Sequence, residues 1–359
     1  MGWFDFLQRL IKTKRQPKPL VRLGGIDYLD AVCHNLVVEH KVPALAATVI
    51  QHGELVLQKG YGYANLDKQI PVDPKRSMFR TASISKCITG LAFGKMVDEG
   101  ILNWDDSFYT HVPYYPKKKH DFSLRQLASH TAGVRGYQGK EYALNKPYEI
   151  WESIEVFKND ALVFEPGNGY LYNSYDFVLL SLAMQEAVGI PFEAYVKEKV
   201  LMPLGMQHTH TPKEILTAHN RQVSKFYTRS ASGFKNATEV NNFYKLAGGG
   251  YLSTSEDIAK LGLELLNQDL LRPETYQQLL TAQTIKGNST YYGLGFQVSE
   301  DASGRRFIGH VGSSIGAYTN FFVYPTQRAI FSLLINCTDP KVQEVLDGAL
   351  EVFFQDLPV

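Results

Sequence analysis

The chain is poor in cysteine and has almost no net charge. Its three cysteines, Cys33, Cys87 and Cys337, are odd in number and far apart, which argues against a disulfide framework and against a zinc cluster. The 37 lysine and arginine residues nearly balance the 36 aspartate and glutamate residues, which leaves a net charge of +1. This balance gives no indication of nucleic-acid binding, because proteins that bind nucleic acid gather positive charge to neutralise phosphates.

Long apolar runs are absent as well. No stretch of about 18 apolar residues occurs, so we expect no membrane-spanning helix. The first apolar stretch, residues 3–11, is interrupted by Asp5, Gln8 and Arg9, and no small-residue cleavage site follows it. A signal peptide has an uninterrupted apolar region followed by a cleavage site, and this stretch has neither, so we expect a cytoplasmic protein. The shares of hydrophobic (44%) and charged (20%) residues are typical of a soluble globular chain.

Residues 1–22 differ in composition from the remaining chain. They carry six basic residues and a single acid, Asp5. On a helical wheel the apolar side chains from position 3 to position 11 fall on one side, and Pro17 and Pro19 end the pattern. This composition is typical of an interfacial helix with a basic flank, which would contact a membrane surface peripherally. The alternatives are a helix packed against the same protein or a partner, and a flexible tail.

Hydrophobic periodicity predicts strands toward both ends of the chain and helices between them. A hairpin is expected over residues 45–51 and 55–60, because two β-rich runs flank His52-Gly53-Glu54. The other expected elements are helices over 26–40, from Ser83 to about 100, 124–129, 174–188, 255–267 and 340–355, and strands near 292–299, 304–310, 316–324 and 328–336.

This order of elements predicts an α+β fold, with an antiparallel sheet built from both chain ends, flanked by helices, and a mainly helical subdomain inserted. After the segment 1–22, we expect a single domain over residues 23–359. Its α/β part would cover about 23–100 and 248–359, and its helical part about 101–247.

The stretch Thr81-Ala82-Ser83-Ile84-Ser85-Lys86-Cys87 carries the pattern Ser-x-x-Lys. If Ser83 opens a helix, Lys86 lies on the same face, with β-carbons about 5–6 Å apart. A serine hydroxyl needs a neighbour that can take its proton, and burial lowers the pKa of a lysine so that it can do so. The apolar run that follows predicts a buried helix. The alternative is an ordinary helix start with a lysine that extends to the surface.

The same pattern occurs a second time, as Ser232-Gly233-Phe234-Lys235. This copy lies in a stretch rich in serine, glycine, asparagine and threonine, which is typical of a surface loop. The context therefore favours Ser83 as the nucleophile.

Two further stretches are candidates for the same site. Tyr172-Asn173-Ser174 lies between a Pro-Gly turn and an apolar helix, where Tyr172 could relay a proton; the alternative is a partly buried tyrosine whose hydroxyl caps a loop. Gly309-His310-Val311-Gly312-Ser313 follows one predicted strand and precedes another. Glycine there would let a substrate approach the backbone, and the alternative is an ordinary strand-end turn.

Together these stretches resemble a known family. Phe79-Arg80-Thr81-Ala82-Ser83-Ile84-Ser85-Lys86, His130-Thr131-Ala132-Gly133, Pro166-Gly167 with Tyr172, Gly248 to Thr254 and His310-Val311-Gly312 occur in the order found in the superfamily of serine β-lactamases and penicillin-binding proteins. The resemblance runs from about residue 25 to 345. It is to the class C-like branch, which holds class C β-lactamases, D-amino-acid peptidases, family VIII-type esterases and mitochondrial β-lactamase-like proteins.

The resemblance implies a role for each matching residue. Ser83 would be the acylated nucleophile, Lys86 its base partner and Tyr172 the second proton carrier. His310 and Gly312 match the strand motif that is Lys-Thr-Gly in many β-lactamases, and the backbone N–H groups of Ser83 and Ser313 would form the oxyanion hole.

Two departures from the family pattern concern the substrate. Ser174 stands where the family's Tyr-x-Asn motif has an asparagine that contacts substrate, and no Lys-Thr-Gly occurs in the chain. An unperturbed histidine is mostly neutral at about pH 7.5, so His310 would offer a substrate carboxylate little charge. We therefore expect poor hydrolysis of β-lactams compared with simple esters.

These observations predict a serine hydrolase that forms an acyl-enzyme on Ser83 and acts on an ester, a small amide or a peptide. They imply no metal and no organic cofactor. One alternative is a β-lactamase or a D,D-peptidase that binds penicillin. A second is a non-catalytic binding or assembly protein that retains the fold.

Overall fold

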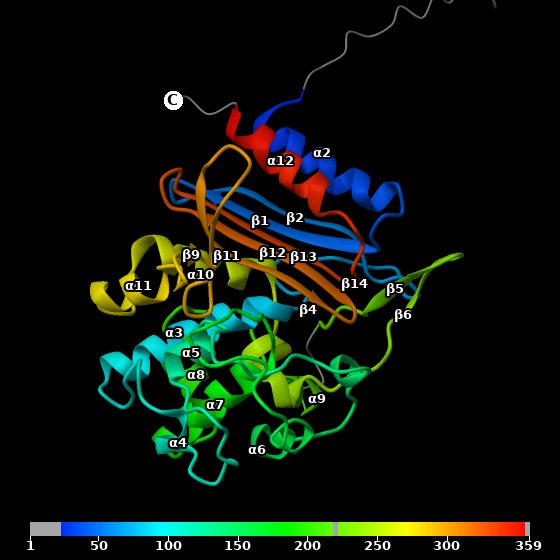
Figure 1. Cartoon of the computed structure of the whole chain (residues 1–359). Helices are drawn as coiled ribbons and strands as arrows, with labels where there is room; N and C mark the ends of the chain where they lie inside the picture. Colours follow the sequence, from blue (N-terminus) through cyan, green and yellow to red (C-terminus); the bar gives the residue numbers. More distant parts are fainter. Residues whose placement is uncertain (1–22, 218–221, 356–359) are drawn as a thin grey trace, which may run out of the picture.

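The structure, a computed structural model, describes residues 23–217 and 222–355. The interfacial helix predicted within residues 1–22 therefore lies outside the described residues. A seven-stranded sheet forms the centre of the molecule, with the strand order β10-β11-β12-β13-β1-β2-β3 (Figure 1). The strands are β1 (Ala44–Gln51), β2 (Glu54–Asn65), β3 (Ile70–Pro71), β10 (Gln297–Glu300), β11 (Arg306–Ser314), β12 (Ala317–Tyr324) and β13 (Ala329–Ile335).

The two ends of the chain meet in the middle of this sheet. Strand β1 pairs with β13 in antiparallel register, for example Leu45 with Ile335 and Val49 with Phe331. On its other side β1 pairs with β2, which confirms the predicted hairpin and extends it to Asn65. The strands β12 and β13 are buried throughout, because helices cover both faces of the sheet at this point. The predicted antiparallel sheet built from both chain ends is confirmed.

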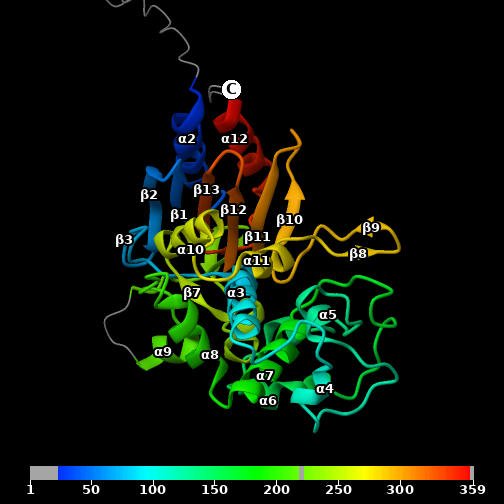
Figure 2. The same cartoon turned by 90° about the vertical axis from the view of Figure 1, so that its left-hand side faces the viewer.

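Different helices cover the two faces. Helices α2 (Gly25–Val38) and α12 (Gln343–Gln355) lie side by side on one face, and α10 (Ser255–Asn267) packs on the other (Figures 1 and 2). Under α2 and α12, an apolar cluster joins residues such as Leu29, Phe331 and Leu350. A second and larger cluster lies on the α10 side and continues into the helical part of the molecule.

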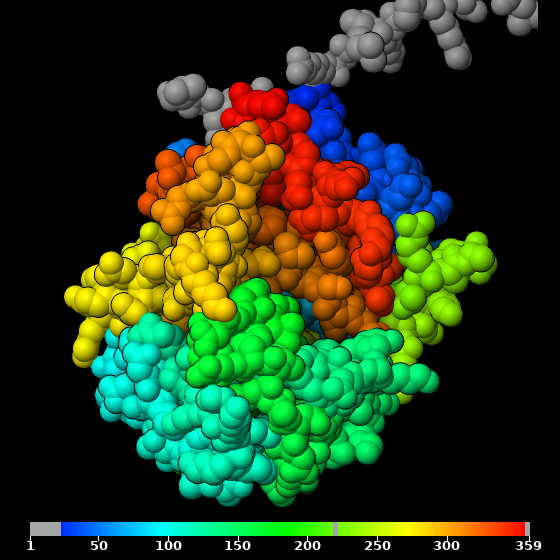
Figure 3. Space-filling view, viewed as in Figure 1, coloured from blue at the N-terminus to red at the C-terminus, as the bar shows by residue number. Residues whose placement is uncertain are grey.

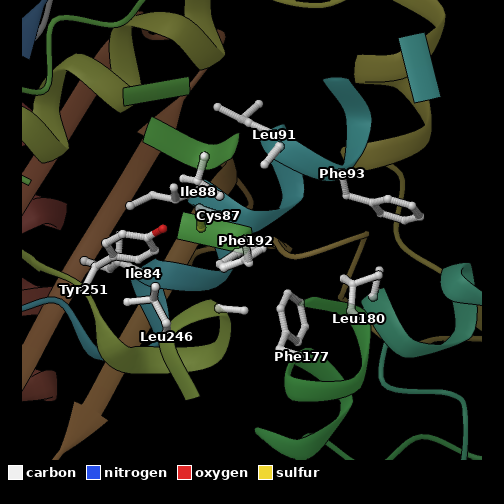
Figure 4. Packing of buried hydrophobic residues seen from close by; sticks show 14 of the residues in the cluster. Ile84, Cys87, Ile88, Leu91, Phe93, Phe177, Leu180, Phe192, Leu246 and Tyr251 are labelled. Atoms are coloured by element: carbon white, nitrogen blue, oxygen red, sulfur yellow. The ribbon is translucent and has the colours of Figure 1, made fainter. Parts of the chain in front are cut away.

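Helix α3 (Ser85–Asp98) lies at the centre of the second cluster and is buried on nearly every side. Figure 4 shows its apolar side chains together with those of α7 (Tyr175–Val188) and α8 (Phe192–Val196). The labelled residues of this cluster are Ile84, Cys87, Ile88, Leu91, Phe93, Phe177, Leu180, Phe192, Leu246 and Tyr251. The prediction of a buried helix after Ser83 is therefore confirmed.

The remaining α-helices and strands are short. The helices are α4 (Phe108–His111), α5 (Leu124–Ala128), α6 (Ile150–Ser153), α9 (Pro212–Thr217) and α11 (Pro273–Leu279). The strands are β4 (Phe79–Arg80), β5 (Tyr227–Ser230), β6 (Gly233–Asn236), β7 (Leu252–Ser253), β8 (Thr284–Ile285), β9 (Asn288–Ser289) and β14 (Cys337–Thr338). Within the described ranges no single helix is long and apolar enough to cross a membrane, although α7 and the helical stretch Phe192–Leu201, bent by 82° between them, pass that test as a pair.

Most predicted elements appear within a few residues of their expected bounds, and two strands differ. Strand β10 begins at Gln297 and not near 292, because residues 291–295 form turns with positive φ at Tyr291 and Gly295. Strand β11 runs through Gly309 and Gly312 to Ser314, so the prediction that His310 ends a strand is wrong. Backbone pairing with β12, for example His310 with Phe321 and Gly312 with Thr319, overrides the glycine signal there. The expected boundaries of the helical part, 101 and 247, remain a prediction.

Candidate active site

Ser83 lies in a short 3₁₀ turn, Ala82–Ile84, directly before α3, and not in the α-helix itself. Ala82 has a φ of 47°, a left-handed conformation that is uncommon for a residue with a β-carbon. Such backbone strain persists only where the surrounding structure holds it in place, and it is frequent at active sites. Here strand β11 holds the turn, because a β-carbon at Gly312 would lie 2.9 Å from the Thr81 carbonyl oxygen and 3.0 Å from the Ala82 β-carbon.

Lys86 lies one turn after Ser83 and is completely buried. Its Nζ donates to the carbonyl oxygen of Gly248 at 2.6 Å and lies 3.4 Å from Ser83 Oγ. Burial lowers the pKa of Lys86 to about 7, and the positive charge of Lys245 acts in the same direction. A large fraction of this lysine is therefore neutral near pH 7 and able to accept a proton.

Tyr172 approaches Ser83 from the segment before α7. Its ring is partly exposed, but its hydroxyl is directed inward and donates to Ser83 Oγ at 2.6 Å. The Lys86 ammonium lies 4.8 Å from the centre of the Tyr172 ring. Burial of the hydroxyl raises the pKa of Tyr172, so it stays protonated at neutral pH. The structure thus brings together the three residues that the sequence singled out as nucleophile and proton carriers.

A buried polar cluster lies behind Tyr172. The ring of His130 is 4.6 Å from that of Tyr172, and its Nδ1 is 2.9 Å from Oδ2 of Asp176. Asn173 joins the cluster by donating from Nδ2 to the same carboxyl oxygen at 2.7 Å. Burial raises the pKa of Asp176 and lowers that of His130, so burial opposes the charged form of both groups. The cluster fixes the backbone that carries Tyr172, and residue patterns alone gave no role to these three side chains.

His310 belongs to the same interior layer and not to the open part of the site. Its Nδ1 donates to its neighbour's carbonyl oxygen, Val311 O, at 2.6 Å, which leaves Nε2 to accept from the Tyr292 hydroxyl at 3.1 Å. Burial, with the positive charge of Lys86 as a second cause, lowers the pKa of His310 to about 3. His310 is therefore neutral over the whole physiological range, more firmly than an unperturbed histidine would be.

The free edge of strand β11 passes Ser83. Val311 donates its N–H to the side chain of Gln297, on the side of the strand that faces away from β12. Because N–H groups alternate between the two edges of a strand, the N–H of Ser313 points toward the same edge, two residues farther along. Strand β10 pairs only as far as Gly309, so this part of the edge is not covered by it. Arg80 fixes the end of the edge by donating to the carbonyl oxygen of Ile315 at 2.6 Å.

A cavity of about 290 Å³ lies beside Ser83. Ser174 and Ser313 line it together with the backbone of Gly248 and Gly249, whereas Gly312 and His310 do not. Figure 3 shows the molecule hollowed between the orange and red C-terminal part and the green segment below it. The cavity also has walls that the sequence did not indicate, contributed by Tyr137, Tyr142 and Lys245. Tyr142 and Lys245 lie in single 3₁₀ turns and Tyr137 lies in a loop, and such short segments show no periodicity that indicates which way a side chain points.

The second Ser-x-x-Lys copy takes no part in this site. Ser232 is exposed in the turn of the β5–β6 hairpin, and Lys235 is exposed on β6. Neither residue lines the cavity of Ser83.

Comparisons with known proteins agree with this geometry. A family model described as Beta-lactamase matches residues 9–353. The human serine beta-lactamase-like protein LACTB, a mitochondrial protein, is 25% identical over 400 aligned residues, which cover 84% of this chain and 72% of that protein.

Two solved structures share the fold. An octameric penicillin-binding protein homologue from Pyrococcus abyssi has a TM-score of 0.81 and 24% identity, covering 92% of this chain and 77% of its own. A D-amino acid amidase from Ochrobactrum anthropi has a TM-score of 0.79 and 20% identity, covering 92% of this chain and 99% of its own. They confirm the predicted α+β fold, and the family model, which spans nearly the whole sequence, shows that the chain belongs to the beta-lactamase family, within the superfamily of serine β-lactamases and penicillin-binding proteins.

Proposed function

We propose that the chain is a hydrolase that forms an acyl-enzyme on Ser83 and acts on an ester or a small amide. One observation carries the proposal: the hydroxyl of Ser83 lies within 3.4 Å of a buried lysine and 2.6 Å of a tyrosine hydroxyl. A nucleophile, a base and a second proton carrier are the groups that acyl transfer to serine requires. The amidase that shares the fold supports the inclusion of amides.

In the acylation step, neutral Lys86 accepts the proton of Ser83 Oγ while the oxygen attacks the carbonyl carbon of the substrate. The developing oxyanion accepts hydrogen bonds from the backbone N–H groups of Ser83 and Ser313. Tyr172 is protonated and gives its proton to the departing alcohol or amine, and Lys86 returns a proton to Tyr172. The products are the acyl-serine ester and the free leaving group.

Deacylation runs through the same groups in reverse order. A water molecule takes the place of the leaving group and loses its proton to the Tyr172–Lys86 pair as it attacks the acyl carbon. Ser83 Oγ then departs and recovers its proton. The sum of the two steps is the hydrolysis of one ester or amide bond by one water, with the enzyme unchanged.

Neutral His310 favours esters without a carboxylate on the leaving side. The family's Lys-Thr-Gly lysine would place a permanent charge at this strand position, and His310 places none there. Penicillins and cephalosporins carry their carboxylate on the ring that holds the departing nitrogen, so they lose a charge-assisted hydrogen bond, which is roughly twice as strong as a neutral one. Efficient β-lactam hydrolysis is therefore the less favoured alternative.

A fluorophosphonate probe followed by peptide mass spectrometry tests the proposal. We expect the probe to label Ser83, and Ser83→Ala to lose both the label and the hydrolysis of short 4-nitrophenyl esters. Ser232→Ala is the matched control and should keep both. Labelling that persists in Ser83→Ala, or that maps to Ser232, would contradict the assignment. If the native chain takes up no label and hydrolyses no ester, the non-catalytic binding protein becomes the better interpretation.

A further inference from the structure

The cavity beside Ser83 contains a buried cation that the catalytic steps above do not use. Lys245 is 7% exposed and lines the cavity together with Ser83. Within residues 23–217 and 222–355, it makes one hydrogen bond, a long one of 3.3 Å from Nζ to the carbonyl oxygen of Tyr142. Among the described residues, no carboxylate lies within ion-pair distance of Lys245. A buried ammonium that lacks an acidic partner is costly, and it is retained most readily where a ligand supplies the negative charge.

A second unused donor lies in the same wall. The hydroxyl of Tyr137 is buried and makes no hydrogen bond of standard geometry with the part of the chain that the structure describes, although the side chains of Ser174 and Tyr244 are close to it. Its ring centre lies 5.3 Å from the ammonium of Lys245. Two residues whose donors lack good partners therefore line the same small cavity, and a carboxylate has two oxygens that could accept from such a pair.

Arg80, a second cation near Lys245, already has other partners. Arg80 donates to the carbonyl oxygen of Ile315 and its guanidinium stacks over Phe226 at 4.0 Å. Its positive charge adds to burial in lowering the pKa of Lys245, to about 8. Lys245 is thus mostly charged at pH 7, in an electropositive wall.

The position of the cavity indicates which half of the substrate it receives. Tyr172 protonates the leaving group in the proposed mechanism, so the leaving group lies beside Tyr172. The cavity is lined by Ser83, Ser174 and Gly249 and does not include Tyr172. The group that stays on Ser83 after the first step, the acyl group, is the part that faces Lys245.

We infer that Lys245 and Tyr137 bind a carboxylate on the acyl half of the substrate, which makes half-esters or half-amides of short dicarboxylic acids the preferred substrate class. This inference rests on the proposed hydrolytic function and adds a specificity-determining pair to it. It is compatible with poor β-lactam hydrolysis, because the carboxylate of a β-lactam lies on the leaving side.

Two matched esters test the inference. Mono-4-nitrophenyl adipate carries the carboxylate, and 4-nitrophenyl 6-oxoheptanoate replaces it with a neutral acetyl group of the same size. The quantity measured is the ratio of kcat/KM for the anionic ester to kcat/KM for the neutral one. We expect the ratio to be about ten or more in the native chain, because a hydrogen bond to a charged group contributes an order of magnitude or more in affinity.

Variants test whether Lys245 and Tyr137 cause the preference for the anionic ester. Lys245→Met should lower the ratio by about tenfold or more, and Tyr137→Phe by a few-fold. Lys245→Arg keeps the charge and should retain part of the preference. Lys235→Met removes the same charge from the exposed Ser-x-x-Lys copy, so it should leave the ratio at its native value.

The pH dependence of the same kcat/KM ratio is a second test, and it needs no variant. Lys245 loses its charge as the pH rises through about 8, so the ratio should fall over that range. Dividing the two rates removes the titration of Lys86, since both esters require it equally.

A native ratio of one or less would overturn the inference, and this result does not depend on whether any variant folds. A ratio unchanged in a Lys245→Met variant that still labels at Ser83 would overturn it as well. In both cases the neutral ester is still hydrolysed, so the proposed function stands. Failure to hydrolyse either ester, with Ser83 unlabelled, would remove the proposed function and this inference together.

Discussion

The two Ser-x-x-Lys copies have the same spacing and opposite surroundings. Lys86 is completely buried, and burial lowers its pKa to about 7. Lys235 is exposed on the β5–β6 hairpin, away from the cavity of Ser83. The spacing brings a hydroxyl and an amine near each other, but desolvation and the hydrogen bond to Ser83 from Tyr172 are what make the first pair suited to acyl transfer.

We expect the largest difference between the two Ser-x-x-Lys copies when the proposed proton carriers Lys86 and Tyr172 are replaced. Lys86→Ala and Tyr172→Phe should each lower kcat for a 4-nitrophenyl ester by about 10²- to 10⁴-fold, the usual contribution of general acid–base catalysis. Lys235→Ala removes the same side chain from the exposed copy and should leave kcat unchanged. Steady-state kinetics on the three variants provide the comparison.

The double variant Lys86→Ala/Tyr172→Phe tests whether the two residues act together. Residues that act as one unit are strongly non-additive, so the double variant should be little worse than either single one. If the two losses multiply instead, Lys86 and Tyr172 act in separate steps and the shared proton-transfer role is wrong.

Sequence patterns indicated much of this site because its central residues lie next to regular elements. Ser83 and Lys86 adjoin a buried apolar helix, and Tyr172 precedes another, so periodicity placed them beside helices, and the family resemblance gave them their expected roles. The prediction that a strand ends at His310 is wrong, because glycine is typical of strand ends but backbone pairing with β12 continues strand β11 past it. The sequence gives no sign of Lys245 and Tyr137 for a different reason: one lies in a single 3₁₀ turn and the other in a loop, where only tertiary packing decides that a residue lines the cavity.

A comparison of kcat/KM for esters and for β-lactams tests the proposed role of His310. Because His310 is neutral, kcat/KM for a short 4-nitrophenyl ester should clearly exceed kcat/KM for nitrocefin at about pH 7.5. His310→Lys should narrow this difference in kcat/KM by adding a positive charge at the strand position where many β-lactamases have lysine. His310→Asn, which is neutral, is the control and should not narrow it. Native turnover of nitrocefin that equals turnover of the best ester would contradict this account of His310 and favour the β-lactamase alternative.

The smallest expected effect on chemistry comes from residues 1–22, which we predict to be dispensable for hydrolysis and to bind an anionic membrane surface. Basic residues near such a surface contribute about 1 kcal/mol each, and salt weakens the attraction. Sedimentation with anionic liposomes, for the full chain and for a chain lacking the segment, measures the difference at low and high salt. Equal sedimentation of both forms would show that the segment has another role, such as packing on the protein.

The rate at which a fluorophosphonate labels Ser83, measured against pH, tests the central claim most directly. Lys86 must be neutral to accept the proton of Ser83, so the rate should rise with pH and level off above about 7, the pKa to which burial lowers this lysine. Lys86→Ala should lose this inflection. A rate in the native chain that keeps rising toward 10.5, the ordinary pKa of a lysine, would show that Lys86 is not the desolvated base on which the account depends.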